Sequence, residues 1–209
     1  PCGCPGHSGS ATITTITMSF VAALFLLLTG STSAQLAGKA KAETHLAMPV
    51  QHCTKAGGCK FEKTTAVLDG NWRWLHKSGC TNSSTCNCFL GNDWVNKTCS
   101  SIDQCTKTCA LDGEDEKGYR EKYGISADGS GLLNMTFVTH YKSSAGNGTN
   151  IGARMYLLED ESHYKMFNLL NREITFTIDS SNLPCGLNGA LYFVEMDADG
   201  GAAKFPTNQ

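Results

Sequence analysis

The stretch Pro184–Gly201 reads Pro-Cys-Gly-Leu-Asn-Gly-Ala-Leu-Tyr-Phe-Val-Glu-Met-Asp-Ala-Asp-Gly-Gly. A proline and a glycine break the preceding segment, Ala190–Val194 is an apolar run long enough for one buried strand, and the final Asp-Gly-Gly is a turn signal. Alternate side chains of an extended chain point the same way, so the amide of Asn188 and the phenol of Tyr192 should share one face. A face with these two groups suits a sugar-binding surface.

Outward from this stretch, short strand-like runs alternate with Gly, Asn and Asp turns. Glu173–Asp179 alternates apolar and polar residues, as a strand with one buried face does. Tyr164–Leu170 is ambiguous between strand and helix, and Glu114–Tyr123 is the one short helix we expect, ended by Gly124. Many strands and little helix predict an all-β sandwich. The remaining expected strands are Thr64–Asp69, Asn71–His76, Leu132–His140, Ala153–Leu158 and Ala190–Val194.

Composition and the N-terminal region indicate a secreted, extracellular protein. The 209 residues include 11 cysteines and carry a net charge of −2, without the Lys/Arg cluster that nucleic-acid binding needs. Met18 opens an apolar run followed by small residues, which predicts a signal peptide over residues 18–34 and a mature protein from Gln35. The alternative is a buried core helix. Residues 1–17 are then a non-native upstream segment, and residues 35–209 form one domain without a membrane anchor.

Cysteine spacing predicts disulfides rather than a metal centre. Three pairs have five residues between their members, whereas paired zinc ligands prefer two to four. Cys185 is left without a partner, and an odd cysteine in a secreted chain is unusual. The expected pairs are Cys53 with Cys59, Cys80 with Cys86, Cys99 with Cys105 and, from the two cysteines left over, Cys88 with Cys109.

Sequons for N-linked glycosylation begin at Asn82, Asn96 and Asn147. A fourth begins at Asn134, but it lies in a strand-like run and is not expected to be used. We expect glycans on the first three, which lie in loop-like sequence.

Ordered blocks of the chain, from about Glu43 to Asn208, resemble the cellulases of glycoside hydrolase family seven, which comprises cellobiohydrolases and endoglucanases. The stretch Pro184–Gly201 is nearly identical to a block of that family. Asp69-Gly-Asn-Trp-Arg-Trp-Leu-His76 is close to the family pattern Asp-x-Asn-Trp-Arg-Trp-x-His. Further matching blocks are Glu43–His45, the Cys53–Cys59 loop, Lys122–Gly124, Asn150–Leu157 and Lys204–Asn208.

The resemblance implies the N-terminal part of a jelly-roll, concanavalin-A-like β-sandwich of two antiparallel sheets, incomplete in this chain. It also implies hydrolysis of β-1,4-glucan with retention of configuration, by two carboxylates about 5–5.5 Å apart. The family takes both from a Glu-x-Asp-x-x-Glu motif. The only Glu-x-Asp here, Glu195-Met-Asp197, is followed by Gly200 instead of Glu and lies in a different block. We therefore assign no catalytic residue, no metal and no cofactor.

The family's substrate path can be carried over residue by residue. Trp74 resembles the tryptophan that stacks a glucose ring at the tunnel entrance, and aromatic faces suit the flat C–H faces of glucose. Trp72 is expected in the core. Arg154 could instead be an ion-pair partner. The full set of expected contacts to cellulose and cello-oligosaccharides is Asn71, Trp74, Tyr123, Asn150, Arg154, Asn188 and Tyr192, whose polar members offer directional hydrogen bonds.

Three hypotheses remain at this stage. The first is a monomeric cellulase, a cellobiohydrolase in preference to an endoglucanase, of which this chain carries binding residues but not the carboxylates. The second is a non-catalytic carbohydrate-binding sandwich. The third is a disulfide-rich structural protein without a ligand, which predicts that cello-oligosaccharides leave the fluorescence of Trp74 unchanged.

Overall fold

The computed structural model describes residues 9–10, 42–82, 84–143 and 146–206. These fall into two compact units: a larger one from Ser31–Lys165 and Met196–Gln209, and a smaller one from Pro1–Gly30 and Met166–Glu195. The predicted signal peptide and its cleavage point lie outside the described residues. No helix within the described residues is long and apolar enough to span a membrane.

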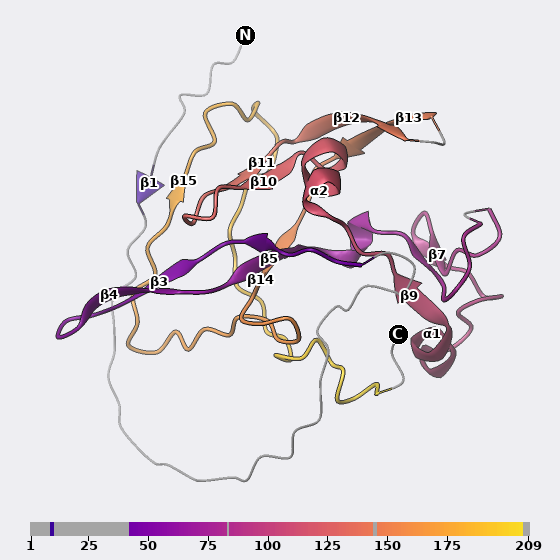
Figure 1. Ribbon diagram of the computed structural model, residues 1–209, viewed down its shortest axis with the longest axis horizontal. Helices are drawn as coiled ribbons and strands as arrows, with labels where there is room; N and C mark the ends of the chain where they lie inside the picture. The colour runs from indigo at the N-terminus through magenta and orange to yellow at the C-terminus, as the bar shows by residue number, and fades with distance from the viewer. Residues whose placement is uncertain (1–8, 11–41, 83, 144–145, 207–209) are drawn as a thin grey trace. The chain divides into compact units, whose positions relative to one another are not determined.

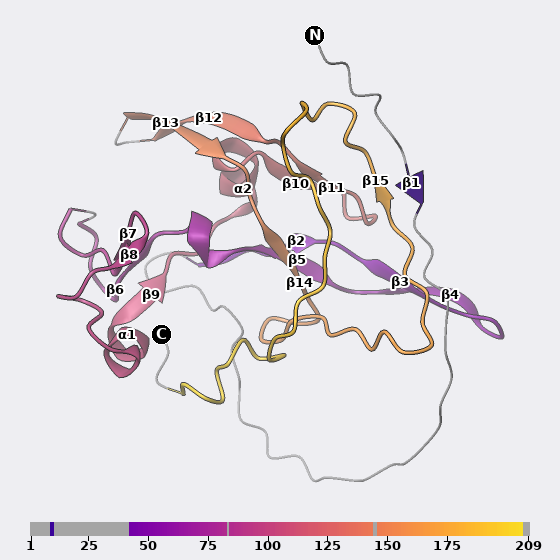
Figure 2. The same cartoon turned by 180° about the vertical axis from the view of Figure 1, so that it is seen from behind.

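A three-stranded antiparallel sheet forms the centre of the larger unit (Figures 1 and 2). Its middle strand is β5 (Thr65–Leu68), which pairs with β14 (Met155–Leu158) on one side and β2 (Leu46–Ala47) on the other. Val67 and Leu68 are fully buried. The apolar runs that predicted strands at 64–69 and 153–158 therefore do form strands. β14 pairs with β5 along its whole length, and β2 pairs with its first two residues.

The core of the larger unit lies on both faces of β5. Successive side chains of a strand point to opposite faces, so Val67 and Leu68 enter two different clusters. One cluster contains Leu46, Leu68, Tyr119, Tyr123 and Ile125, with Trp72 packed against it. The other contains Val67, Leu158 and Tyr164. The prediction that Trp72 belongs to the core is confirmed.

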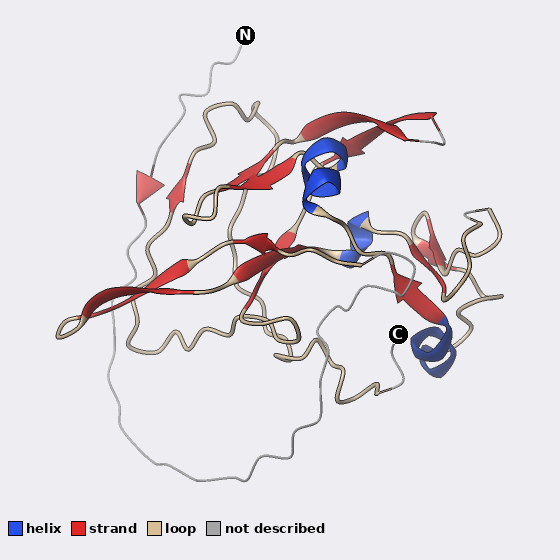
Figure 3. Cartoon of the chain, in the orientation of Figure 1, coloured by secondary structure: helices blue, strands red, loops and turns tan. Residues whose placement is uncertain are grey.

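The other sheets of the larger unit are two-stranded and antiparallel, and strands greatly outnumber helices (Figure 3). This confirms the predicted all-β class, with sheets that do not close. The pairs are β3 (Val50–Thr54) with β4 (Gly58–Glu62), β6 (Leu75–Lys77) with β9 (Cys109–Leu111), β7 (Phe89–Leu90) with β8 (Asp93–Trp94), β10 (Ile125–Ala127) with β11 (Leu133–Met135), and β12 (Val138–Ser143) with β13 (Gly146–Ile151).

Two short helices have side-chain caps. The expected helix is α2 (Glu116–Lys122), whose N-cap Asp115 accepts a hydrogen bond from the Gly118 amide at 2.7 Å and which ends before Gly124 at φ 68°. The second helix, α1 (Ile102–Thr108), was not predicted. Its signal is Ser101, whose hydroxyl caps the helix by accepting from the Gln104 amide.

Two strand predictions are wrong in detail. Residues 71–76 do not form one strand, because the Asp69 carboxylate accepts from the Asn71 amide and turns the chain into a short 3₁₀ helix, η1 (Gly70–Trp72), before β6 begins. Residues 132–140 form two strands, β11 and β12. The chain changes partner between them, where the Thr136 amide donates to the Gly124 carbonyl.

In the smaller unit, β15 (Thr177–Ile178) pairs with β1 (Gly9–Ser10). The alternation predicted for 173–179 is confirmed as a pattern of exposure, since Ile174, Phe176 and Ile178 are half-buried and the threonines between them are exposed. The strand itself is only two residues long. Residues 190–194 form no strand, and residues 164–170 form neither a strand nor a helix, apart from one bridge at Tyr164.

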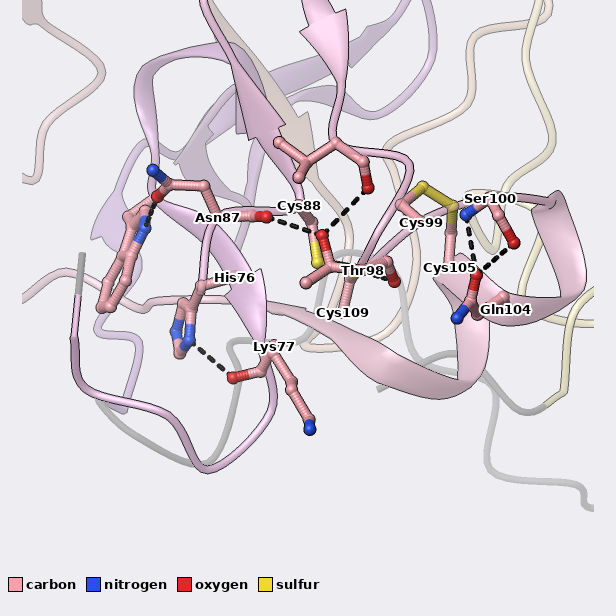
Figure 4. The surroundings of a disulfide bond; sticks show 12 residues. His76, Lys77, Asn87, Cys88, Thr98, Cys99, Ser100, Gln104, Cys105 and Cys109 are labelled. Atoms are coloured by element: carbon pink, nitrogen blue, oxygen red, sulfur yellow. Dashed lines mark hydrogen bonds between the residues drawn. A yellow bond between two sulfur atoms is a disulfide. The ribbon is translucent and has the colours of Figure 1, made fainter. Parts of the chain in front are cut away.

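The four predicted disulfides are present, and Figure 4 shows the region around two of them. The sulfur atoms of Cys88, Cys99 and Cys109 are buried in one small apolar cluster. The expectation that Cys185 is a free thiol is wrong: Cys185 is disulfide-bonded.

Candidate functional site

Asp69 anchors the first group of predicted binding residues. It follows β5, and its carboxylate accepts from the Asn71 amide at 2.7 Å and from Nε of Arg154 at 2.8 Å. The Asp69 amide in turn donates to the Arg154 carbonyl at 2.9 Å. Arg154 is thus an ion-pair partner, as the alternative interpretation held, yet 38% of its side chain remains exposed. Asn71 is exposed as well.

Trp72 lies at the centre of this group. Its indole N–H donates to the Ile151 carbonyl at 3.3 Å, and the guanidinium carbon of Arg154 lies 5.8 Å from the ring centroid, within the range of a cation–π contact. Tyr123 donates its hydroxyl to the Trp72 carbonyl at 3.0 Å and is only 3% exposed, so its phenol belongs to the core. Asn150 is half-buried, and its amide donates to the Gly152 carbonyl at 2.9 Å.

These residues are called here the Trp72 cluster: Asp69, Asn71, Trp72, Tyr123, Asn150 and Arg154. The structure thus brings together four of the residues expected to contact substrate. Asn71 and Arg154 keep polar groups at the surface that could meet sugar hydroxyls. Asn150 is half-buried in β13 and precedes Ile151, whose carbonyl accepts from Trp72. The Tyr123 hydroxyl is already used within the protein.

Trp74 belongs to a different group, the Trp74 cluster of Trp74, His76, Asn87 and Asp112. The half-buried indole donates its N–H to Oδ1 of Asn87 at 2.6 Å. Its ring stacks on the imidazole of His76, with 3.9 Å between centroids and 17° between planes. Trp74 and His76 are two residues apart in an extended segment, so their side chains share one face.

Hydrogen bonds hold His76 on both ring nitrogens. Nε2 lies 3.0 Å from Oδ1 of Asp112, and Nδ1 lies 2.9 Å from the Lys77 carbonyl, which Figure 4 shows. Sequence reasoning missed His76, Asn87 and Asp112. The signal for His76 was an aromatic ring two positions from a tryptophan in extended sequence, but the approach of the other two depends on the fold.

The main chain between the two tryptophans is fixed by Arg73. This buried guanidinium is paired with Glu43, donates Nε to the Leu68 carbonyl at 2.9 Å and donates Nη2 to the Tyr119 hydroxyl at 2.9 Å. Burial is the largest influence on Arg73 and opposes its charge, but the hydrogen bonds to Glu43 and the charge interactions with Tyr119, Glu43 and Tyr123 together outweigh it and raise the pKa of the guanidinium. Burial likewise raises the pKa of the Tyr119 phenol. Arg73 therefore stays charged and Tyr119 stays neutral.

Comparison with known proteins identifies the family. Residues 37–209 match the family model described as Glycosyl hydrolase family 7. The chain belongs to this family. The family 7 assignment agrees with the resemblance seen in the Asp69–His76 block, which builds parts of both tryptophan clusters.

Solved structures agree with this family 7 assignment. A cellobiohydrolase from Daphnia pulex is 46% identical with a TM-score of 0.71, and it is matched over 83% of this chain and 37% of its own length. A cellobiohydrolase from Melanocarpus albomyces complexed with cellotetraose is 40% identical with a TM-score of 0.69 and the same coverage. Glycosynthase mutants from Humicola insolens are 28% identical with a TM-score of 0.63, over 82% of this chain and 41% of theirs.

This family 7 chain therefore spans less than two fifths of the length of the two cellobiohydrolase structures. Their match confirms the predicted fold, an incomplete jelly-roll β-sandwich.

Asn188 and Tyr192 of the family 7 chain lie in the smaller unit. Both side chains are exposed, Tyr192 by 56%. Because residues 188–192 form no strand, their expected common face on a strand is not observed, and their role in substrate binding stays a prediction. In the larger unit, Asp197 is paired with Lys204. The four sequon asparagines, at positions 82, 96, 134 and 147, are all exposed.

Proposed function

We propose that this chain is the substrate-entrance part of a secreted, monomeric retaining cellulase that acts on β-1,4-glucan, a cellobiohydrolase in preference to an endoglucanase. Family 7 membership supports the activity class. The subtype is supported by 46% and 40% identity to two cellobiohydrolases. Cello-oligosaccharide binding is supported by the second of these proteins, which was solved with cellotetraose.

The observation that carries the proposal is the state of Trp74. Its N–H is satisfied by Asn87, one ring face is covered by His76, and the side chain is still only half-buried. What remains accessible of the indole is therefore on its other face or edge. Such a surface offers glucose an apolar platform that costs no unsatisfied hydrogen bond.

Within this proposal the chain contributes binding rather than bond cleavage. The family's nucleophile and acid/base come from a Glu-x-Asp-x-x-Glu motif that this sequence does not contain. Contacts to glucosyl units remote from the scissile bond still serve the reaction, because they supply binding energy that orients the chain at the reacting centre. We therefore expect the chain alone to bind cello-oligosaccharides and to hydrolyse none.

The test is calorimetric titration of the chain with cellotetraose. Trp74→Ala removes the stacking platform and should weaken binding by about tenfold or more, since a 1.4 kcal/mol loss corresponds to about tenfold in Kd. Trp94→Ala is the matched control, because Trp94 is 58% exposed but lies in the β7–β8 hairpin with its ring against Phe89. Equal affinity of Trp74→Ala and the parent chain would contradict the proposed role of Trp74.

Secretion has its own measurement. The four disulfides between Cys53 and Cys109 suit an oxidising compartment. Expressed in a eukaryotic host, the protein should reach the medium, begin at Gln35 and carry glycans on Asn82, Asn96 and Asn147. Mass spectrometry of the secreted material measures all three expectations, and an intact segment 18–34 would refute the cleavage.

A further inference from the structure

His76 is buried more completely than its partner Trp74. It is 0% exposed, whereas Trp74 is half-buried, so the imidazole forms the inner layer of the stack and the indole the outer one. The 17° angle between the planes makes the contact nearly face to face. The orientation of the indole therefore depends on what holds the imidazole.

Both partners of the imidazole are acceptors. The Lys77 carbonyl can only accept, and the carboxylate of Asp112 can only accept while it is ionised. Two satisfied hydrogen bonds thus require a hydrogen on each ring nitrogen, which is the imidazolium form. A cation against a tryptophan face is attracted by the ring quadrupole, so the same proton strengthens the stack.

The charges around His76 are few. Asp112, after β9, is the ionisable side chain that contacts the imidazole among the described residues, and its side chain is 26% exposed. The exposed Lys77 lies next to His76 on β6. On the side of Asn87, the neighbouring cysteines at 86 and 88 are both in disulfides. Arg73 lies beyond Asp112, donating to its carbonyl at 3.4 Å and paired with Glu43.

We propose that His76 is a positioning residue for Trp74: as an imidazolium held between Asp112 and the Lys77 carbonyl, it fixes the indole plane and leaves one face for a glucosyl ring. This inference rests on the proposed function, in which Trp74 stacks sugar. It adds a residue that touches no substrate but sets the geometry of one that does.

A pH dependence of binding follows. When the imidazolium loses a proton, one ring nitrogen turns a lone pair toward an oxygen, and one of the two bonds is lost. The cation–π attraction on the indole disappears with it. The stack then loosens, and affinity for cellotetraose should be about two- to tenfold lower at the high end of the pH range than at the low end.

The experiment measures cellotetraose binding by calorimetry between about pH 5 and pH 8, the range in which histidine titrates. His76→Ala should bind about two- to tenfold more weakly than the parent at low pH and show a flat profile. His76→Phe restores a flat ring under the indole, so it should recover affinity without recovering the pH dependence. Asp112→Asn should also flatten the profile, because an amide can donate to an unprotonated nitrogen as well as accept.

A readout that needs no sugar accompanies the titration. Nitrogen NMR of the unliganded parent chain should show hydrogens on both ring nitrogens of His76 at low pH. This measurement on the parent chain keeps the proposal testable if His76→Ala does not fold.

The two possible failures are distinguishable. A neutral single tautomer of His76 across the range, or a pH profile identical in the parent and in Asp112→Asn, would overturn the positioning role while Trp74→Ala still weakened binding. Unchanged binding by Trp74→Ala would instead overturn the proposed function on which the inference rests.

Discussion

Two apolar runs of similar length differ in structure: one forms a buried strand, and the other forms no strand and is exposed. Residues 65–68 form β5, with hydrogen-bonded strands on both sides and no more than 2% exposure from Ala66 to Leu68. Residues 190–194 form no strand, and their large side chains are about half exposed, from 42% for Phe193 to 56% for Tyr192. The difference is the presence of partners. A strand is stable only where neighbours bond to its edges and cover its face.

The largest expected effect comes from removing the Glu43–Arg73 ion pair, whose guanidinium bonds to the Leu68 carbonyl of β5. Glu43→Gln leaves the buried charge of Arg73 without its carboxylate, and breaking such a pair costs about 3–5 kcal/mol of unfolding free energy. Urea unfolding measures the loss. Glu121→Gln is the control, because its pairs with Lys117 and Arg120 are exposed and should cost less than about 1 kcal/mol. Equal losses in the two variants would show that the buried Glu43–Arg73 pair contributes no more to the unfolding free energy than an exposed pair.

A direct comparison of the two runs uses leucine truncation. Leu68→Ala opens a cavity in the core and should cost about 2–5 kcal/mol of unfolding free energy. Leu191→Ala removes a side chain that is 51% exposed and should change the unfolding free energy by no more than about 0.5 kcal/mol. The urea midpoints of both variants, measured with unchanged slopes, give the answer. A large cost at Leu191 would mean that its run is covered in solution.

The presence or absence of strand partners also explains which parts of the fold could be predicted from the sequence. Local signals were sufficient where local interactions decide the structure: Gly124 marked the end of α2, and the alternation at 173–179 gave the correct pattern of exposed and half-buried side chains. The extent of a strand was predicted poorly, because it depends on partners far away in sequence. The strand expected at 71–76 does not form because the Asp69 carboxylate accepts a hydrogen bond from the Asn71 amide and turns the chain. The strand propensities of residues 71–76 do not predict this side-chain hydrogen bond.

In the candidate site, too, some residues could be predicted from the sequence, whereas contacts between distant segments could not. A motif resemblance was enough to select Trp74, Asn71, Asn150 and Arg154, three of which the structure gathers around Trp72. It could not show that the Tyr123 hydroxyl would be used by the Trp72 carbonyl, nor that Asp112 and Asn87 would approach the Trp74 stack from other segments. These contacts connect residues between 13 and 51 positions apart. Their prediction requires the fold itself.

The smallest expected effect concerns an ion pair of the larger unit. Lys165 is the last residue before the smaller unit's segment Met166–Glu195, and its ammonium lies 2.7 Å from Glu62 and 3.2 Å from Glu159. The hydrogen bond from Lys165 lowers the pKa of the Glu62 carboxyl, and the bond to Glu62 raises the pKa of Lys165. A lowered acid pKa stabilises the fold above the unfolded value of 4.5, and a raised lysine pKa stabilises it below 10.5.

The pair should therefore contribute between these two pH values and be lost as the pH falls through the folded pKa of Glu62 or rises through that of Lys165. Because Glu62 is partly exposed, Lys165→Met should cost less than about 1 kcal/mol of unfolding free energy at neutral pH, and still less in acid near about pH 3. Urea unfolding at the two pH values measures the difference, with Lys117→Met as the exposed control. A cost that persisted in acid would assign the role of Lys165 to packing of its methylenes.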